Sequence, residues 1–219
     1  MNYKYAIFDM DGTILNTLED LQDALNYALA IEGMPLRTLD EVRRFVGNGV
    51  RKLVERGAGQ GASDELLARL YDNFQVWYKP HCADKTRPYE GVTEVIAKLR
   101  ELGVVTAVVS NKSDGGVQDL CKRFFDGLFD SRIGQRPDAL PKPAPDSVFA
   151  ALAELGASPE DAVYIGDSEV DLQTARNSGL DCIAVEWGFR DREFLKQQGA
   201  SLIVSSPDEL IPLITGTSH

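Results

Sequence analysis

The chain contains few histidines and few cysteines. Its 219 residues include two histidines, His81 and His219, and three cysteines that lie far apart and form no Cys-x-x-Cys pair. Two histidines make a His-rich metal centre or a Ser-His-Asp triad hard to assemble. Three scattered cysteines suggest neither a disulfide framework nor a zinc ribbon, which is typical of a cytoplasmic protein. Any catalysis is therefore expected to depend on carboxylates, lysine or serine.

Long apolar runs and positive charge are also scarce. No stretch approaches the roughly 18 consecutive apolar residues of a membrane-spanning helix, and the first apolar run breaks at Asp9, too early for a signal peptide. The chain has 23 Lys and Arg against 34 Asp and Glu, a net charge of −11, which opposes binding to nucleic acid or an anionic membrane. A small anion could bind only where local cations, a metal ion or main-chain N–H groups outweigh that charge.

Short segments rich in β-branched residues predict strands. Each is a continuous apolar run, which is typical of strands covered on both faces. Four clear segments and a weaker fifth lie at residues 3–8, 104–110, 162–166, 181–185 and 201–204. Helical patterns separate them at residues 91–102, 113–124, 146–155 and 172–178. This alternation predicts a doubly wound, parallel α/β sheet, in which ligands bind beyond the carboxyl ends of the strands.

Residues 17–79 interrupt the alternation with helical periodicities and no strand-like run. A capping box at Thr38 and Glu41 opens one of these helices, and the apolar stripes are interpreted as helix packing. At about 150 residues per domain the chain is long enough for about 1.5 domains. We expect an α/β core formed by residues 1–15 and 85–219, with residues 16–84 inserted as a helical cap.

Two carboxylates follow the first predicted strand, in the segment Asp-Met-Asp-Gly-Thr at residues 9–13. The alternation of side chains along an extended chain turns Asp9 and Asp11 to the same side. Two unpaired carboxylates at one place need a cation, a shared proton or a nearby lysine. Gly12 permits a tight turn, and Gly12 and Thr13 could offer N–H and hydroxyl donors to an anion. The alternative is an acidic turn that caps a helix.

The same segment resembles the first motif of the haloacid dehalogenase superfamily of aspartate-nucleophile phosphohydrolases. Three further motifs of that family are matched in the expected order, each near a predicted strand end: Ser110, then Lys142 in a proline-rich segment, then the acidic Gly-Asp-Ser-Glu-Val-Asp at residues 166–171. The resemblance covers nearly the whole chain, including the position of a helical cap. It implies a Rossmann-like core with the cap inserted after the first strand.

The resemblance also implies roles for the acidic residues. Asp9 would be the nucleophile that forms an aspartyl-phosphate, and also a ligand of Mg²⁺. Asp11 would act as general acid and then as general base, with its main-chain carbonyl on the metal. Asp167 would be a further metal ligand, and Asp171 would support the metal ligands or the lysine, a role that Glu169 could share. Mg²⁺ suits such a site because it prefers oxygen ligands.

Three other residues of the motifs would bind the phosphate group. Ser110 would donate its hydroxyl, Asn111 its amide, and Lys142 would neutralise charge on the transferred phosphoryl group. Ser110 and Asn111 could instead cap the helix that follows them. Lys142 could instead be a solvent-facing lysine in a proline-rich loop.

Residues 43–52 form the densest cationic stretch of the chain. The segment Gly47-Asn48-Gly49 resembles one in the caps of phosphoglycolate phosphatases, which implies a small acidic substrate. The candidate substrate ligands here are Gly47, Asn48, Gly49, Arg43, Arg51 and, as a further choice of cation, Arg44. The alternative is a turn between two helices, flanked by solvated cations.

These observations predict a Mg²⁺-dependent phosphatase that hydrolyses a small phosphorylated metabolite, similar to phosphoglycolate phosphatase. A sugar phosphomutase of the β-phosphoglucomutase type and a pyrophosphatase of the same family remain open. A catalytically silent binding protein that keeps the fold is the alternative outside the enzymes.

Overall fold

The computed structural model describes residues 2–216 of the chain. These residues divide into two compact units. Among the described residues, one unit comprises 2–15 and 88–216, and the other comprises 16–87. None of the helices among the described residues is long and apolar enough to cross a membrane.

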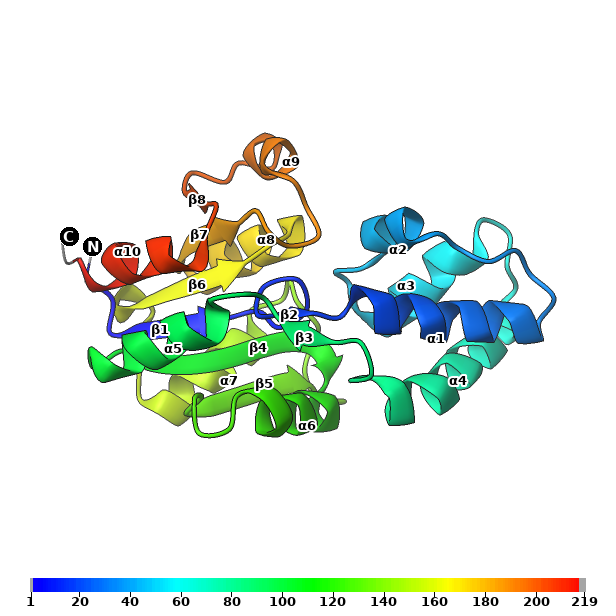
Figure 1. Cartoon of the computed structure of the whole chain (residues 1–219), viewed down its shortest axis with the longest axis horizontal. Helices are drawn as coiled ribbons and strands as arrows, with labels where there is room; N and C mark the ends of the chain where they lie inside the picture. Colours follow the sequence, from blue (N-terminus) through cyan, green and yellow to red (C-terminus); the bar gives the residue numbers. More distant parts are fainter. Residues whose placement is uncertain (1, 217–219) are drawn as a thin grey trace. The chain divides into compact units, whose positions relative to one another are not determined.

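The first unit is built on a parallel sheet of six strands in the order β5-β4-β1-β6-β7-β8 (Figure 1). The strands are β1 (Tyr5–Phe8), β4 (Val105–Ser113), β5 (Ser131–Gln135), β6 (Ala162–Gly166), β7 (Asp181–Val185) and β8 (Ile203–Val204). Tyr5 of β1 pairs with Val105 on one side and with Ala162 on the other. The carboxyl ends of β1, β4 and β6 are therefore neighbours. The doubly wound α/β prediction is confirmed.

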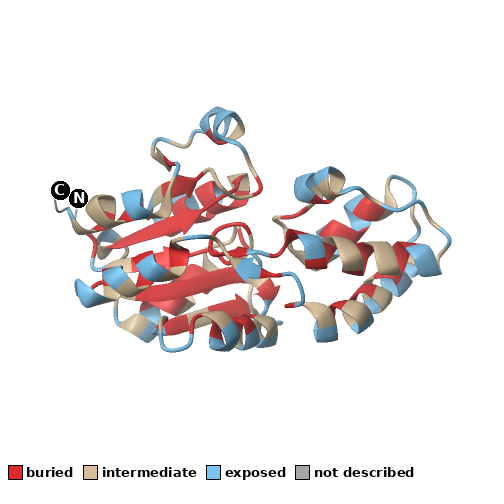
Figure 2. Cartoon of the chain, viewed as in Figure 1, coloured by how far each residue is buried: buried red, intermediate tan, exposed pale blue. Residues whose placement is uncertain are grey.

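Helices cover both faces of this sheet, with α5 packed on α10 and α7 packed on α8 (Figure 1). The elements are α5 (Val92–Glu101), α6 (Asp114–Phe124), α7 (Asp146–Leu155), α8 (Glu169–Ser178), α9 (Arg192–Gln197) and α10 (Leu210–Thr215), with 3₁₀ turns η1 (Pro159–Asp161) and η2 (Pro207–Glu209). The inner strands are buried along most of their length, as Figure 2 shows. Ile7, Val109 and Tyr164 belong to the shared core. Burial on both faces explains the continuous apolar runs.

β5 and α8 differ from the prediction in ways that bear on the site. β5 was not predicted, because its sequence Ser-Arg-Ile-Gly-Gln mixes polar and apolar residues at the edge of the sheet. α8 begins at Glu169, three residues before the predicted start at residue 172. The earlier start follows from the Asp171 carboxylate, which accepts hydrogen bonds from the main-chain N–H of Ser168 at 3.1 Å and from its hydroxyl at 2.6 Å.

The second unit is helical and comprises α1 (Leu18–Ile31), α2 (Leu39–Phe45), α3 (Gly49–Ala58) and α4 (Asp64–His81). α1 packs along α4, and buried leucines such as Leu25 and Leu29 form the predicted stripe. The capping box at Thr38 and Glu41 is confirmed. No helix was predicted by its bounds at α3, and only the alternative interpretation of the glycine segment, a turn between two helices, implied one there.

The chain passes between the units at β2 (Leu15–Asn16) and β3 (Arg87–Pro88), which pair with each other. The helical unit extends to Arg87, three residues beyond the expected boundary at residue 84. Asp20 accounts for this difference, because its carboxylate accepts hydrogen bonds from the main-chain N–H groups of Lys85 and Thr86. Those bonds tie the returning segment to α1.

Candidate active site

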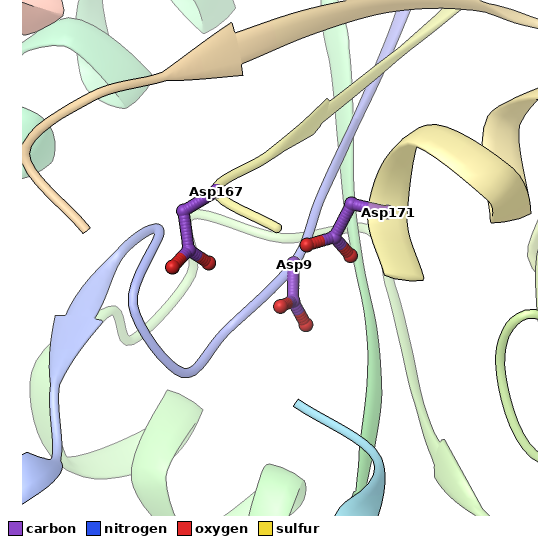
Figure 3. A group of neighbouring side chains, drawn as sticks. All are labelled: Asp9, Asp167 and Asp171. Carbon is purple, nitrogen blue, oxygen red and sulfur yellow. The ribbon is translucent and has the colours of Figure 1, made fainter. Parts of the chain in front are cut away.

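Three buried carboxylates converge at the carboxyl ends of the central strands. Asp9 follows β1, Asp167 follows β6, and Asp171 lies in the first turn of α8. One oxygen of each lies within 4.8 Å of the others (Figure 3). The parallel register of β1 and β6 explains how residues so distant in sequence meet. This is the edge at which open α/β sheets bind ligands.

Lys142 reaches the same cluster from the loop between β5 and α7. Its Nζ atom lies 2.8 Å from an oxygen of Asp9, 2.8 Å from an oxygen of Asp171 and 2.9 Å from the hydroxyl of Tyr164. Tyr164 in turn donates to Asp171 at 3.2 Å. The Lys142 side chain is 2% exposed, so it is not a solvent-facing lysine. It supplies one positive charge to three carboxylates.

The charge imbalance shifts the ionisation of the carboxyl groups. Burial, and then the charge of Asp171, raise the pKa of Asp9 well above its usual value, although Lys142 opposes this shift. Burial and the same neighbour raise the pKa of Asp167 to about 7. Burial alone would lower the pKa of Lys142, but the charges of Asp171 and Asp9 outweigh it and raise that pKa. The cluster is therefore a place where a further cation would be strongly favoured.

The turn after β1 is shaped around Asp167. Gly12 has φ = 92°, and a Cβ atom at this position would lie 2.4 Å from an oxygen of Asp167. The Thr13 hydroxyl donates to Asp167 at 3.1 Å, while the Gly12 N–H donates to the carbonyl of Leu15 at 2.8 Å. These groups were expected to face an anion. They are engaged inside the protein instead, because the turn must close and Asp167 must be held.

Asp11 lies outside the group of three carboxylates. Its Oδ1 atom is 3.1 Å from the Nζ of Lys112, in an ion pair whose orientation does not make a hydrogen bond. The side chain of Lys112 is buried, whereas that of Asp11 is 22% exposed. Sequence reasoning gave Lys112 no role, although it directly follows Ser110 and Asn111. Asp11 is thus more open to solvent than Asp9, whose side chain is 11% exposed.

The hydroxyl of Ser110 is buried at the end of β4. Its oxygen accepts a hydrogen bond from the main-chain N–H of Lys112 at 3.1 Å. Within residues 2–216, no group accepts a hydrogen bond from the Ser110 hydroxyl. The hydroxyl proton is therefore available to a ligand.

The side chain of Asn111 contacts the main chain of Lys142. Its amide nitrogen donates to the main-chain carbonyl of Lys142 at 3.0 Å, and its oxygen accepts from the Lys142 N–H at 2.7 Å. Asn111 was expected to bind phosphate or substrate. In the structure its side chain contacts the loop that carries the lysine, because β4 ends beside that loop, and its binding of phosphate or substrate stays a prediction.

The segment after β7 contains residues of the site that sequence reasoning missed. Trp187 donates its indole N–H to the carbonyl of Thr13 at 3.0 Å, and the Phe189 N–H donates to Asp167 at 2.7 Å. A Cβ atom on Gly188 would lie 2.3 Å from the Cβ of Asp167. The available signal was weak: an aromatic residue and a glycine directly after a predicted strand.

The hydrogen-bond partners of Glu169 and Tyr164 show what each of these two side chains does at the site. Glu169 pairs with Arg190 at 2.9 and 3.1 Å, and so faces the segment after β7. Tyr164 is wholly buried in β6 and reads in the sequence as a core residue. Its hydroxyl forms hydrogen bonds only because the fold brings Lys142 and Asp171 next to it.

In the helical unit, Asn48 lies between α2 and α3 with a glycine on each side. Gly47 has φ = 120° and Gly49 has φ = 80°, so both take conformations that favour glycine. Arg56 donates to the side-chain oxygen of Asn48 at 2.7 Å. These contacts fix the loop within its own unit.

The arginines expected to meet a substrate have partners within the helical unit. Arg43 lies 3.9 Å from Asp40. The guanidinium of Arg51 lies 4.5 Å from the centre of the Tyr71 ring. Arg51 and Tyr71 line a cavity of about 290 Å³ between α3 and α4, whereas Arg43 does not.

Comparison with known proteins decides the family. Residues 6–185 match the haloacid dehalogenase-like hydrolase family. The match runs from the second residue of β1 to the end of β7 and includes every residue of the buried cluster. The chain belongs to this family. The residues that meet at the carboxyl ends of the strands therefore belong to the sequence motifs of this family.

Relatives of known name are similar along nearly the whole chain. The phosphoglycolate phosphatase of Caulobacter vibrioides is 36% identical over 98% of this chain and 94% of its own. The N-acetylmuramic acid 6-phosphate phosphatase of Pseudomonas aeruginosa is 31% identical over 98% of this chain and 96% of its own. A solved protein of Lactobacillus delbrueckii subsp. bulgaricus superposes with a TM-score of 0.95, at 39% identity over 99% of this chain and 100% of that one.

Proposed function

We propose that this hydrolase is a phosphatase that cleaves small phosphate monoesters through an aspartyl-phosphate on Asp9. The observation that carries the proposal is the convergence of Asp9, Asp167 and Asp171 on Lys142 at the strand ends. The names of the relatives support the same reaction class.

Asp9 is proposed as the nucleophile and Lys142 as the cation on the phosphoryl group. A carboxylate oxygen of Asp9 attacks phosphorus, and the bond from phosphorus to the substrate oxygen breaks. Lys142 contacts Asp9 at 2.8 Å, so its charge lies beside the group that receives the phosphoryl. Ser110 would donate its available hydroxyl to a phosphate oxygen.

Asp11 is proposed as the group that moves protons. It would give a proton to the departing alcohol oxygen and then take one from the water that hydrolyses the aspartyl-phosphate. Its partial exposure and its place outside the buried cluster suit contact with substrate and water. The roles of Asp9 and Asp11 are thus separated by position.

The residues present fit a divalent cation. Asp9 and Asp167 offer buried carboxylate oxygens with raised pKa values, and one lysine does not balance three carboxylates. We propose that Asp9, Asp167 and the main-chain carbonyl of Asp11 hold Mg²⁺, which prefers such ligands. When bound, the ion would neutralise charge on the phosphate oxygens. Asp171 is proposed to support the site rather than to bind the ion, since both its oxygens already accept hydrogen bonds.

The substrate is proposed to be a phosphate monoester that also carries a carboxylate. Phosphoglycolate and N-acetylmuramic acid 6-phosphate, named in the relatives, share this feature. The loop of Gly47, Asn48 and Gly49, with one arginine such as Arg43 or Arg51, is proposed to recognise it. We also propose that the enzyme acts in the cytoplasm, where small phosphorylated acids and reduced cysteines occur.

The reaction is tested by phosphate release from phosphoglycolate with and without Mg²⁺. We expect turnover that is lost on treatment with EDTA and restored by added Mg²⁺. Asp9→Asn should abolish it, and the wild-type protein should carry acid-stable, hydroxylamine-sensitive phosphate during turnover. A protein that binds phosphoglycolate but releases no phosphate would instead be a silent binding protein.

Substrate class is tested with a panel at equal concentration. The panel comprises phosphoglycolate, N-acetylmuramic acid 6-phosphate, glucose 6-phosphate, pyrophosphate and β-glucose 1-phosphate. We expect the highest kcat/KM for a substrate with a carboxylate, and a loss of that preference in Asn48→Ala or Arg51→Ala. Conversion of β-glucose 1-phosphate to glucose 6-phosphate would identify a phosphomutase, and preference for pyrophosphate a pyrophosphatase.

A further inference from the structure

The loop that carries Lys142 has little regular structure of its own. It runs from the end of β5 at Gln135 to the start of α7 at Asp146 and consists of turns. The side chain of Lys142 has four rotatable carbon bonds, yet its Nζ lies at 2.8 Å from two carboxylates. Something outside the loop must therefore hold the main chain of Lys142 in place.

Asn111 makes that contact with a single side-chain amide. The amide donates to the carbonyl of Lys142 at 3.0 Å and accepts from its N–H at 2.7 Å, so both polar main-chain groups of the lysine are paired. Two hydrogen bonds to one residue fix its orientation as well as its position. Asn111 lies in β4 directly after Ser110, so the strand that places the hydroxyl also places the lysine.

A second asparagine holds the next residue of the loop. Asn177, in α8, donates its amide to the carbonyl of Pro143 at 2.7 Å. α8 also carries Asp171, which receives the lysine ammonium. The loop is thus attached to β4 and to α8, and α8 carries one of the two carboxylates that Lys142 contacts.

We propose that Asn111 is a positioning residue, which acts on the reaction through Lys142 by fixing the main chain of the lysine. This inference rests on the proposed role of Lys142. It differs from direct binding of phosphate by Asn111, because the amide makes its bonds to the loop. It predicts that removing Asn111 matters only while Lys142 is present.

The test is a double-mutant cycle with Asn111→Ala, Lys142→Ala and the double variant, assayed with Mg²⁺ and phosphoglycolate. Asn111→Ala should lower kcat by about 10-fold to 100-fold, the scale of a misplacement near 1 Å, with KM changed less than about threefold. In the Lys142→Ala background the same change should have no further effect on kcat. An equal loss in both backgrounds would overturn the proposal and show that Asn111 acts directly.

The chain offers a matched control. In the helical unit, Asn26 donates to the carbonyl of Arg37 at 2.9 Å and accepts from its N–H at 2.7 Å, the same pair of bonds. Asn26→Ala should lower Tm about as much as Asn111→Ala does, while kcat stays within about twofold of wild type. An equal loss of kcat in Asn26→Ala would mean that Asn111→Ala lowers kcat only by destabilising the protein, and would overturn the proposal.

Two further measurements separate the possible failures. If Asn111→Ala does not fold, Asn111→Asp takes its place, since it keeps the acceptor and loses the donor; kcat should again fall with KM nearly unchanged, and unchanged kcat would overturn the proposal. Full activity of Lys142→Ala would overturn the proposed function itself. Impaired Lys142→Ala beside fully active Asn111→Ala would overturn only the positioning role.

Discussion

Each unit buries aspartate, but the buried carboxylates have opposite surroundings. In the helical unit, Asp20 is 3% exposed and accepts hydrogen bonds from the N–H groups of Lys85 and Thr86 and from the Thr86 hydroxyl. In the α/β unit, Asp9 is 8% exposed and faces two other carboxylates and one lysine. Hydrogen-bond donors of the protein surround the carboxylate of Asp20, whereas the carboxylate of Asp9 has one lysine and two further carboxylates beside it.

The difference separates a structural carboxylate from a reactive one. Donors around Asp20 replace the water that it loses on burial, so it can close the helical unit at little cost. Repulsion and burial around Asp9 leave a carboxylate that a cation or a phosphoryl group would stabilise. Burial of an aspartate therefore does not by itself indicate an active site. Burial of an aspartate beside other carboxylates does.

Asp9→Asn should give the largest effect and the sharpest contrast. Turnover should fall by about 10³-fold or more, because the amide is a poor nucleophile. The Tm of the metal-free variant should stay equal or rise, since burial and Asp171 disfavour the charged form that the substitution removes. Phosphate release and thermal melting in EDTA measure the two quantities. A marked fall in Tm would show that Asp9, like Asp20, is structural.

Gly188→Ala should follow in size. Its Cβ atom would lie 2.3 Å from the Cβ of Asp167 and 2.4 Å from the carbonyl oxygen of Gly12, so Asp167 must move. We expect a loss of about 10²-fold in kcat, together with weaker Mg²⁺ activation. Gly115→Ala is the control, because a Cβ atom there meets nothing within 4 Å. Equal kcat in the two variants would contradict the prediction that the segment after β7 holds Asp167 in the active site.

Asp20→Asn should reverse the pattern of Asp9→Asn. The amide group would face N–H donors, and unfolding free energy should fall by about 1–3 kcal/mol. Turnover at a temperature well below the Tm should stay within about twofold of wild type. Urea unfolding and kcat measure these changes. A large loss of kcat without loss of stability would contradict the division between the two carboxylates.

Trp187→Phe should have the smallest effect. It removes one hydrogen bond, to the carbonyl of Thr13, and keeps an aromatic ring. One bond contributes about 1 kcal/mol, so kcat should fall less than about tenfold. Steady-state kinetics with phosphoglycolate provide the measurement. A loss as large as that of Gly188→Ala would mean that the indole itself has a larger role at the site.

Much of the fold follows from local patterns. β6 (Ala162–Gly166), β7 (Asp181–Val185) and α7 (Asp146–Leu155) have the predicted bounds, because apolar runs and helix stops are local signals. β5 escaped prediction because an edge strand needs less apolar sequence. The helical unit could be expected from its periodicity, but its end at Arg87 depends on a carboxylate near the start of α1.

The site divides in the same way. Asp9, Lys142 and Asp167 could be singled out because their motifs are local and ordered along the chain. Tyr164, Trp187 and Gly188 could not, since each acts through a partner distant in sequence. The contact of Asn111 with the loop of Lys142 could not be predicted for the same reason. An asparagine side chain can bind a ligand or a neighbouring loop, and its partner here is distant in sequence.

The residues and their order were sufficient to specify an acidic α/β protein with a helical insert and four motifs of one hydrolase family. The tertiary structure alone decided which donors are engaged inside the protein and which carboxylates crowd together. Local propensity depends on neighbours in the chain, whereas pKa shifts and hydrogen-bond partners depend on neighbours in space. Parallel pairing of β1 with β4 and β6 creates those neighbours.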